Sequence, residues 1–430
     1  MRDEIKARIA QINAGIAPAG YKKTKVGIVP EEWETKALGQ VLTRVSNAVD
    51  VEPETMYTQI GIRSHGNGLF YKEPVSGEEL GNKSVFWIEP GCFILNIVFA
   101  WEQAIGKTTE QEVGMIASHR FPMYKPNDLD IDYLVFYLLT KRGTVLLDLA
   151  SPGGAGRNRT LGQEHFLKSK VPLPPLPEQQ KIAEILTAQD AVIALLQKQI
   201  ELLQKQKKAF LQKMFPKKGS TVPEIRFAGF TDAWERRKLG EVLSLLKDGT
   251  HGTHQNSDEG VYLLSAKNIK NGQIVIDEET DRKISVEEFE TIHSNFKLKE
   301  NDVLLTIVGS IGETAILKNP DTATFQRSVA FLRPNEDTIS IFLKTEIETD
   351  IFQKELSDRK SQSAQPGVYL GELEKIPFYV TSIQEQEKIG AFFSNLDSLI
   401  TLHQRKLEIE QQKKKALMQL LLSGKVRVES

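Results

Sequence analysis

Apolar and polar residues follow a helical period over two long stretches of the chain, residues 178–215 and 385–422. Apolar side chains recur there every three to four positions. The first stretch contains neither Gly nor Pro, the residues that disfavour a helix most strongly. At 1.5 Å per residue, each stretch predicts a helix about 57 Å long. Prolines precede and follow the first stretch, and Pro377 and Gly424 bound the second, so we expect two long and separately bounded helices.

The apolar seam of each predicted helix fits a heptad repeat, but polar residues interrupt it. Gln189 and Lys207 stand in the seam of the first stretch, and His403 and Lys414 in that of the second. A seam of this kind is too polar for a stable helix on its own, and it favours a matched partner. We expect the two helices to pack on each other as an antiparallel coiled coil.

The two stretches are copies of one sequence. Aligned without gaps, they carry the same residue at more than a third of their positions, and each residue lies 207 before its counterpart. A second echo lies upstream of each copy, where Trp33-Glu34 recurs as Trp234-Glu235. Self-similarity at two separate markers indicates an internal duplication, which would relate the two halves by a pseudo-two-fold axis.

Between the helical stretches, short β-rich runs alternate with turns and with short helical patterns. Residues 132–140 and 340–356, for example, read as helices. We predict an α+β protein with two globular domains of mixed helix and sheet, separated by the two long helices. The expected parts are an N-terminal helix in residues 1–20, a first globular domain at 21–177, a first helical spacer at 178–218, a second globular domain at 219–384 and a second helical spacer at 385–430.

Composition is that of a globular protein, and the distribution of charge alters the meaning of its total. Of the 430 residues, 40% are hydrophobic and 26% are charged, and the formal net charge is −2. This total averages two mildly basic helical stretches with an acidic second globular region. It therefore does not exclude nucleic-acid binding through local basic clusters. The single cysteine, Cys92, excludes an internal disulfide and a cysteine-based zinc site.

The sequence carries no catalytic signature that we can recognise. It has no Gly-rich phosphate loop that opens a helix and no nucleophile elbow. His251 and His254 have the spacing of metal ligands on a helix, but they lie in the Gly-rich segment DGTHGTHQN, which favours a turn or contact loop. We expect a non-catalytic chain without metal or cofactor. Its charged N-terminus and short apolar runs favour a cytoplasmic protein without a membrane partner.

Several segments resemble the specificity (S) subunit of type I restriction–modification enzymes, over essentially the whole chain. These segments are KVPLPPLPEQQKIAEIL (170–186) and its second copy (375–393), the residues that lead into Trp33 and Trp234, DGTHGTH (248–254), LLTIVGSIGETAIL (304–317) and SAQPGVYLGEL (363–373). The resemblance implies two target-recognition domains, each of which reads one half of a bipartite sequence in double-stranded DNA. It also implies that the helices space the two halves, that two methyltransferase (M) subunits dock on the helices, and that restriction (R) subunits complete the enzyme.

The two domains differ in sequence, so we expect an asymmetric DNA target. Base edges are read by side chains such as Arg, Lys, Asn and Gln, and we therefore take polar residues of Gly-rich or basic loops as candidate DNA contacts. They are Arg157, Asn158 and Arg159 in the first domain and His251, Lys267, Asn268, Gln326, Arg327, Arg359 and Lys360 in the second. The alternative function is a non-catalytic coiled-coil scaffold with two protein-binding domains, in which DNA has no part.

Overall fold

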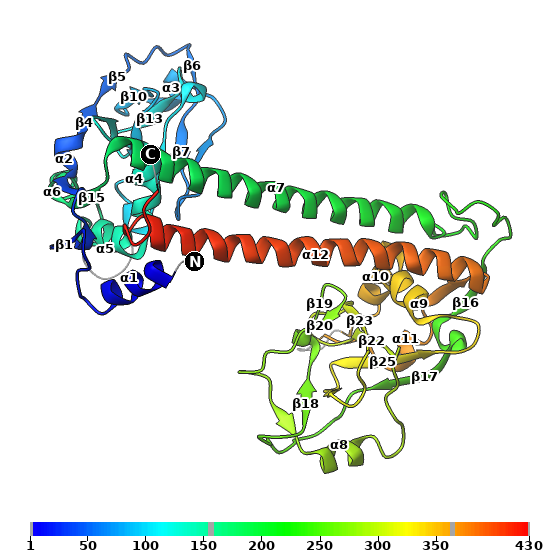
Figure 1. Ribbon diagram of the computed structural model, residues 1–430. Coiled ribbons are helices and arrows are strands. Elements are labelled where there is room, and N and C mark those ends of the chain that lie inside the picture. The colour runs from blue at the N-terminus through cyan, green and yellow to red at the C-terminus, as the bar shows by residue number, and fades with distance from the viewer. Residues whose placement is uncertain (1–2, 154–158, 362–365, 429–430) are drawn as a thin grey trace. The chain divides into compact units, whose positions relative to one another are not determined.

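Two helices of 39 residues each, α7 (Leu176–Met214) and α12 (Ile383–Leu421), organise the computed structural model (Figure 1). The structure describes residues 3–153, 159–361 and 366–428. By its internal contacts the chain divides into two compact units. The first unit comprises Met1–Leu195 and Leu407–Ser430, and the second comprises Leu196–Lys406. Each unit therefore contains one part of α7 and one part of α12.

The halves of α7 and α12 run antiparallel within each unit, as the sequence predicts. In the first unit, the Asp190 carboxylate pairs with the Lys414 ammonium at 2.6 Å. In the second unit, the Lys207 ammonium pairs with the Asp397 carboxylate at 2.6 Å. Asp190 and Asp397 occupy the same position of the repeat, as do Lys207 and Lys414. Antiparallel pairing thus makes the same ion pair twice, and each pair supports the register in its own unit.

In each unit, an arginine from the segment after the helix that ends there pairs with a carboxylate at the start of the helix that begins there. In the first unit, the Arg427 guanidinium pairs with Glu178 at 2.7 Å, and Trp33 Nε1 donates to the same carboxylate at 3.1 Å. In the second unit, Arg226 forms a two-pronged pair with Glu385 at 2.6 and 2.8 Å. Glu178 and Glu385 are buried, and a buried carboxylate needs such a partner.

Short elements make up the globular part of the first unit. In chain order they are α1 (Asp3–Asn13), β1 (Tyr21–Thr24), β2 (Gly27–Pro30), β3 (Glu34–Ala37), α2 (Leu38–Val41), β4 (Leu42–Val45), β5 (Asn47–Ala48), β6 (Met56–Tyr57), β7 (Ile60–Ile62), β8 (Leu69–Tyr71), β9 (Val75–Ser76), α3 (Gly77–Leu80), β10 (Val85–Trp87), β11 (Phe93–Leu95), η1 (Ala100–Glu102), β12 (Ile105–Lys107), η2 (Glu110–Glu112), β13 (Ile116–Ser118), β14 (Met123–Pro126), α4 (Ile131–Leu138), α5 (Lys141–Leu149), α6 (Gln163–Lys168) and β15 (Lys170–Leu173).

The globular part of the second unit is built in a similar way. Its elements are β16 (Glu235–Lys238), η3 (Leu239–Val242), β17 (Leu243–Asp248), β18 (Val261–Leu264), η4 (Ala266–Asn268), β19 (Ile269–Lys270), β20 (Gln273–Ile274), β21 (Lys283–Ile284), α8 (Val286–Ile292), β22 (Val303–Thr306), β23 (Thr314–Ile316), β24 (Ala323–Phe325), β25 (Val329–Pro334), α9 (Ser340–Ile347), α10 (Asp350–Asp358), α11 (Leu370–Leu373) and β26 (Pro377–Val380). We call the two globular parts the first and the second module.

The larger sheets of the two modules share one topology. The larger sheet of the first module has the strand order β12-β11-β14-β4, and that of the second has β23-β22-β25-β17, with every described neighbour antiparallel. Matching these orders aligns the β11–β12 hairpin with the β22–β23 hairpin. Sequence comparison alone does not align these two hairpins. The structure therefore extends the duplication through the diverged middle of each half.

One glutamine fastens each module to its long helix in the same way. Gln179 Oε1 accepts from the Asp130 backbone N–H at 2.9 Å, and its Nε2 donates to the carbonyls of Pro174 and Asp128. Gln386 makes the equivalent three bonds, to Ile339 and to the carbonyls of Thr381 and Asp337. Both glutamines are buried, and they occupy the same position of the repeat.

Each module also packs an apolar core against the helix ends of its own unit. In the first unit, Leu421 and Leu422 of the α12 end join Trp33 in one buried cluster. In the second, Met214 and Phe215 of the α7 end join Trp234, and the Phe215 and Trp234 rings meet edge to face at 5.6 Å. The two tryptophans that mark the repeat in the sequence are thus the points where each module receives a helix end.

One predicted helix proves to be two. The pattern across residues 340–356 suggested a continuous helix, but α9 ends at Ile347 and α10 begins at Asp350. Thr349 has extended backbone angles, and its hydroxyl accepts from the Phe352 backbone N–H at 3.3 Å. A threonine in this position is a favourable N-cap, so it starts a new helix and breaks the old one.

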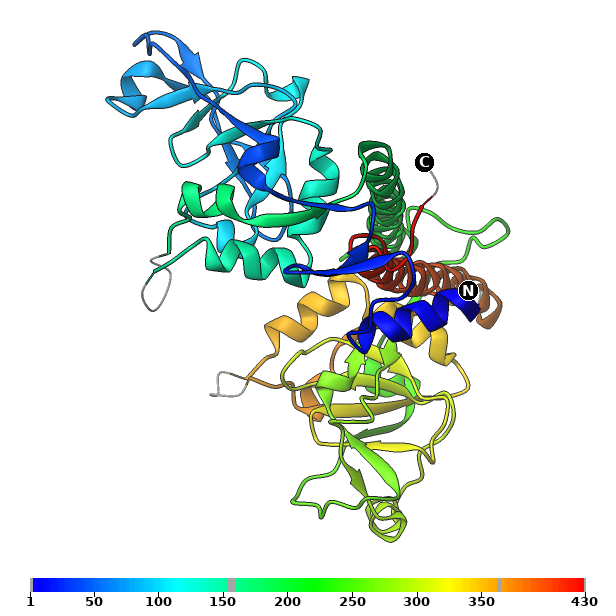
Figure 2. The ribbon, with the colours of Figure 1, turned by 60° about the vertical axis from the view of Figure 1, so that its left-hand side comes forward.

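The first and last described segments contact each other in the first unit; Figure 2 draws α1 in dark blue and the end of the chain in dark red. Tyr21 Oη donates to the Gly424 carbonyl at 2.8 Å, and Lys425 Nζ donates to Asn13 Oδ1 at 2.6 Å. Helix α1 buries none of its residues. We expected a helix in this region, and its described polar contacts connect it to Tyr21 and to the chain end.

Candidate nucleic-acid interface

Five loops of the second module converge at one edge of its larger sheet. Backbone bonds connect them: Arg327 N donates to Thr250 O, Gln326 N to Leu264 O, Ile307 N to Ser328 O and Val368 N to Ile307 O, all at 2.8–3.0 Å. These bonds bring together the segments 248–254, 264–268, 307–312, 326–328 and 359–368, apart from residues 362–365, which lie outside the described part. We call this set the second loop cluster. It contains the loops of all the candidate DNA contacts predicted for this module.

Close backbone packing explains one glycine of the DGTHGTH motif. A Cβ on Gly249 would lie 2.2 Å from the Phe325 carbonyl oxygen and 2.3 Å from that of Gln326. No side chain fits at those distances, so glycine alone lets residues 248–254 approach the turn that carries Arg327. The motif therefore serves to join two loops of the cluster.

The predicted contacts of the second module divide into two groups. Arg327 and Lys360 are exposed and Gln326 is half-buried, and among the described residues none of the three side chains has a hydrogen-bonding or ionic partner. The other four are engaged within the module. His251 contacts the Asp248 carboxylate, Lys267 pairs with Asp281 at 2.7 Å, and Arg359 pairs with Glu355.

Asn268 plays a structural part in this cluster. It is 4% exposed, its Nδ2 donates to the Val275 carbonyl and to Asp281, and its Oδ1 accepts from Ser265 N. Burial alone would raise the pKa of Asp281, but bonds from the Asp277 backbone N–H, Lys267 and Asn268 lower it. Asn268 and Lys267 thus hold a buried carboxylate that shapes their loop.

His254 belongs to the same framework. Its Nε2 lies 2.8 Å from Thr250 Oγ1 and its Nδ1 lies 2.7 Å from Glu288 Oε1 on α8. The side chain therefore closes the 250–254 loop onto α8. In the part of the chain that the structure describes, no three His, Cys, Asp or Glu side chains are arranged to hold a metal ion.

In the first module, two of the three predicted contacts, Arg157 and Asn158, lie outside the described residues. The third, Arg159, is engaged. Its guanidinium pairs with Asp148 at 2.7 Å, donates to the Ser151 carbonyl and lies 5.4 Å from the centre of the Trp101 ring. These contacts leave its fork little freedom to reach a ligand.

The first module has its own loop cluster, which sequence reasoning missed. Ile97 N donates to Arg120 O and Leu161 N donates to Ile97 O, at 2.9 and 2.8 Å. The second module has the same two bonds, from Ile307 N to Ser328 O and from Val368 N to Ile307 O. In the first module, the two bonds bring the turn with His119 and Arg120, both exposed, beside the segment after α5. The shared Ile-Val after β11 and β22 was the available signal, but two residues are too short to align on.

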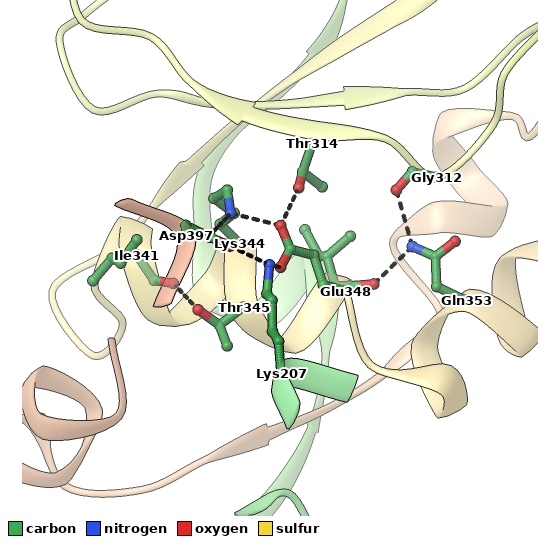
Figure 3. A network of polar contacts seen from close by, with 10 residues as sticks. Lys207, Gly312, Thr314, Ile341, Lys344, Thr345, Glu348, Gln353 and Asp397 are labelled. Carbon is green, nitrogen blue, oxygen red and sulfur yellow. Dashed lines mark hydrogen bonds and ion pairs between the residues drawn. The ribbon is translucent and has the colours of Figure 1, made fainter. Parts of the chain in front are cut away.

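A charged network connects the second module to both long helices of its unit (Figure 3). Lys344 on α9 contacts Glu348 at 2.6 Å and Asp397 at 3.1 Å, and Lys207 contacts the same two carboxylates, each at 2.6 Å. Burial opposes both charges, yet the two lysines lower the pKa of Glu348, and the two carboxylates raise the pKa of Lys344. Thr314 Oγ1 donates to Glu348 at 3.0 Å. Each charge of the network therefore meets an opposite one.

Comparison with known proteins accounts for this duplicated architecture. The model of the "Type I restriction modification DNA specificity domain" matches residues 30–205 and again residues 231–411. The chain belongs to this family and carries its domain twice. Among the described helices, none combines the length and the apolar composition that spanning a bilayer requires.

Similar proteins include two type I specificity subunits. The Methanocaldococcus jannaschii MjaVIII specificity subunit is 26% identical over 422 residues, which cover 94% of this chain and 95% of the relative. The Escherichia coli EcoBI specificity subunit is 26% identical over 238 residues, about half of each chain.

Two solved structures have the same fold. One comes from a study of complex assembly and conformational transition in the type I R-M system, with a TM-score of 0.55 and 17% identity. It is covered to 99%, and this chain to 93%. The other is the S subunit of a type I system from M. genitalium, with a TM-score of 0.55, 13% identity and coverage of 93% and 96%.

Proposed function

We propose that this chain is the DNA sequence-specificity subunit of a type I restriction–modification enzyme, in which each module reads one half of an asymmetric, bipartite site in double-stranded DNA. One observation carries the proposal: two modules of one fold, each with a cluster of converging loops, sit on a pair of reciprocally matched helices. The exposed residues of the two clusters differ, so the two half-sites should differ as well.

The long helices set the number of base pairs between the half-sites. In an unbroken helix each residue adds about 1.5 Å, so the number of helical residues fixes the distance between its ends. B-DNA repeats about every 10 bp, so a fixed distance corresponds to a fixed number of base pairs between the half-sites. Deleting four residues around Gln197, about one turn, should shorten the non-specific spacer or abolish binding. Mapping the methylated sites of the variant enzyme tests this, and an unchanged spacer would contradict the role of the helices.

The catalytic steps belong to partners, and the chain works without a cofactor of its own in the cytoplasm. Two M subunits would dock on the helices, and R subunits would complete the enzyme. Exposed apolar residues on the helices support two copies of one partner. In the first unit they are Val192, Leu195 and Ile409, and in the second Leu399, Leu402 and Leu202, which are the same three repeat positions. Equivalent apolar positions on both helices suit two equivalent docking partners.

Single aspartates test this docking. Leu195→Asp and Leu402→Asp should each remove one of two M subunits from the complex, because a charge in an apolar interface is costly. Mass photometry of the reconstituted complex counts the bound copies. Gln197→Asp, about 200° round the same helix from Leu195, is the matched control and should keep both. Retention of both M subunits by the two leucine variants would contradict the assignment.

A protein-binding scaffold is the second candidate, and membership of a DNA specificity family does not favour it. The two functions differ in salt dependence. A subunit that contacts phosphates should lose DNA affinity steeply and linearly in log salt once its M subunits are bound. Genome-wide mapping of methylated bases, with and without the gene, then gives the site. A missing bipartite motif would overturn the proposed function.

A further inference from the structure

We propose that the first half-site is contacted by the turn Ser118–Phe121, through His119 and Arg120, and this inference rests on the proposed function. The turn joins β13 to β14. It is the structural counterpart of the turn that carries Gln326 and Arg327 between β24 and β25 in the second module. The three residues 157–159, which the basic composition of their loop suggested, are then not the main readers of this half-site.

Three backbone bonds establish the equivalence. Phe121 N donates to Ser118 O and Val329 N donates to Gln326 O, both at 3.0 Å, so both turns have the same closure. Arg120 O accepts from Ile97 N at 2.9 Å, just as Ser328 O accepts from Ile307 N at 2.9 Å. The third bond is made by the carbonyl of the same isoleucine: Ile97 O accepts from Leu161 N in the first module, and Ile307 O accepts from Val368 N in the second. His119 thereby takes the position of Arg327, and Arg120 that of Ser328.

The side chains at these positions are available to a ligand. His119 and Arg120 are exposed, and no described residue offers either side chain a hydrogen bond or an ion pair. Arg159 is different, because Asp148, Ser151 and Trp101 already engage its guanidinium. Arg159 would have to break its ion pair before it could contact a base, and this costs free energy. Arg120 has no such cost, so it is better placed to contact DNA.

The chemistry of the two turns also explains an asymmetric target. An arginine fork bonds the O6 and N7 of guanine in two places, and glutamine bonds adenine in the same bidentate manner. The first turn presents Ser, His and Arg, while the second presents Gln, Arg and Ser. The same backbone thus offers different donors at successive positions. We expect a guanine among the bases of the first half-site.

Methylation mapping of the reconstituted enzyme, with its M subunits, tests the inference. Arg120→Ala should lower discrimination at one base pair of the first half-site by about 5- to 150-fold and leave the second half-site unchanged. Arg120→Lys keeps the charge but loses the fork, so it should keep most of the affinity and still lose discrimination. Arg327→Ala is the reciprocal variant and should relax the second half-site alone.

Two controls separate the outcomes. Lys168→Ala removes a charge from α6, where the side chain is exposed and lies 3.5 Å from Glu164, and it should change neither half-site. Arg159→Ala should relax the first half-site less than Arg120→Ala does, and it should leave the second half-site unchanged. An intact first half-site in the Arg120→Ala enzyme would overturn the inference while the bipartite motif of the unaltered enzyme keeps the proposed function. Relaxation of the first half-site by Arg159→Ala alone would restore the 157–159 loop as its reader.

Discussion

The two units attach a module to the same helix pair by different chemistry. In the second unit, Lys344 of α9 and Glu348, the residue after α9, join Lys207 and Asp397 in a buried charged network. The common glutamine anchors align α9 with α4 of the first unit, where Val135 and Leu139 take the places of Lys344 and Glu348. Lys414, the counterpart of Lys207, lies there 5.4 Å from the Phe136 ring centre. The duplication has kept the pair between the helices and changed what each module offers it.

The largest effect should come from removing one buried charge of the network. Lys344→Met leaves Glu348 and Asp397 with a single lysine, and loss of one buried partner costs about 3–5 kcal/mol. Hydrogen exchange should show the loss in the second unit. The double change Lys344→Val with Glu348→Leu copies the first unit and keeps Lys207 with Asp397, so it should recover most of the stability. A double variant as unstable as the single one would mean that packing, and not charge balance, sets the cost.

Asp190 and Asp397 occupy the same position of the repeat, but we expect them to contribute unequally to stability. Asp397 contacts two lysines and its side chain is 28% exposed, whereas Asp190 contacts one and is 42% exposed. We expect Asp397→Asn to cost about 1–3 kcal/mol and Asp190→Asn about 0–1 kcal/mol, since exposed ion pairs contribute little. Urea denaturation, monitored by hydrogen exchange in each unit, measures the loss of stability in both variants. Equal costs would remove the distinction between the units at this pair.

The glutamine anchors, by contrast, should matter equally. Gln179→Ala and Gln386→Ala each leave one part-buried backbone N–H and two carbonyls without their glutamine partner. Each change should cost about 1–3 kcal/mol in its own unit. The same denaturation experiment compares them, with exposed Gln197→Ala as control. A twofold difference between the two would show that the modules differ at the anchor as well as at the network.

The smallest effect should be a pH dependence confined to the second unit. Burial raises the pKa of Glu346 well above its usual value, and its Oε1 accepts from Tyr379 N while its Oε2 has no partner among the described residues. The folded state holds this proton where the unfolded state releases it, so the carboxyl costs stability as pH rises above about 4.5. Glu346→Gln should therefore stabilise the second unit at pH 7, and the gain should shrink toward pH 4.

The first unit offers the control for that titration. Its counterpart of Glu346 is Tyr137, whose pKa burial raises to about 12, so it stays neutral through the same range. Denaturation midpoints of both units between pH 4 and pH 7 make the comparison. A gain from Glu346→Gln that did not vary with pH would show that the ionisation of Glu346 does not set the effect.

The long helices and the duplication could be predicted from the sequence, because apolar period and identity both report on them. The polar residues that interrupt the seam also indicated a partner helix, because Lys207 and Lys414 each pair with an aspartate of the other long helix. The break before α10 was missed because a hydrophobic pattern does not register a Thr349 cap.

The candidate contacts were harder to predict because composition does not reveal which side chains are already engaged. Asn268 and Arg159 have the residue types that read DNA, yet tertiary partners hold both. His119 and Arg120 were overlooked for the opposite reason. Their equivalence with the second module lies in main-chain hydrogen bonds, and these persist after the side chains have diverged.

The division of the chain has a consequence for its synthesis. Residues 196–406 form the second unit as one uninterrupted segment, while the first unit needs residues on both sides of it. As the chain leaves the ribosome, the second unit can finish folding first, and the N-terminal part waits for Leu421, Leu422 and Arg427 to cover Trp33 and neutralise Glu178. A chain cut short before residue 407 would leave that surface open to chaperones and proteases. The first unit is therefore completed only after residues 421–427 have been translated.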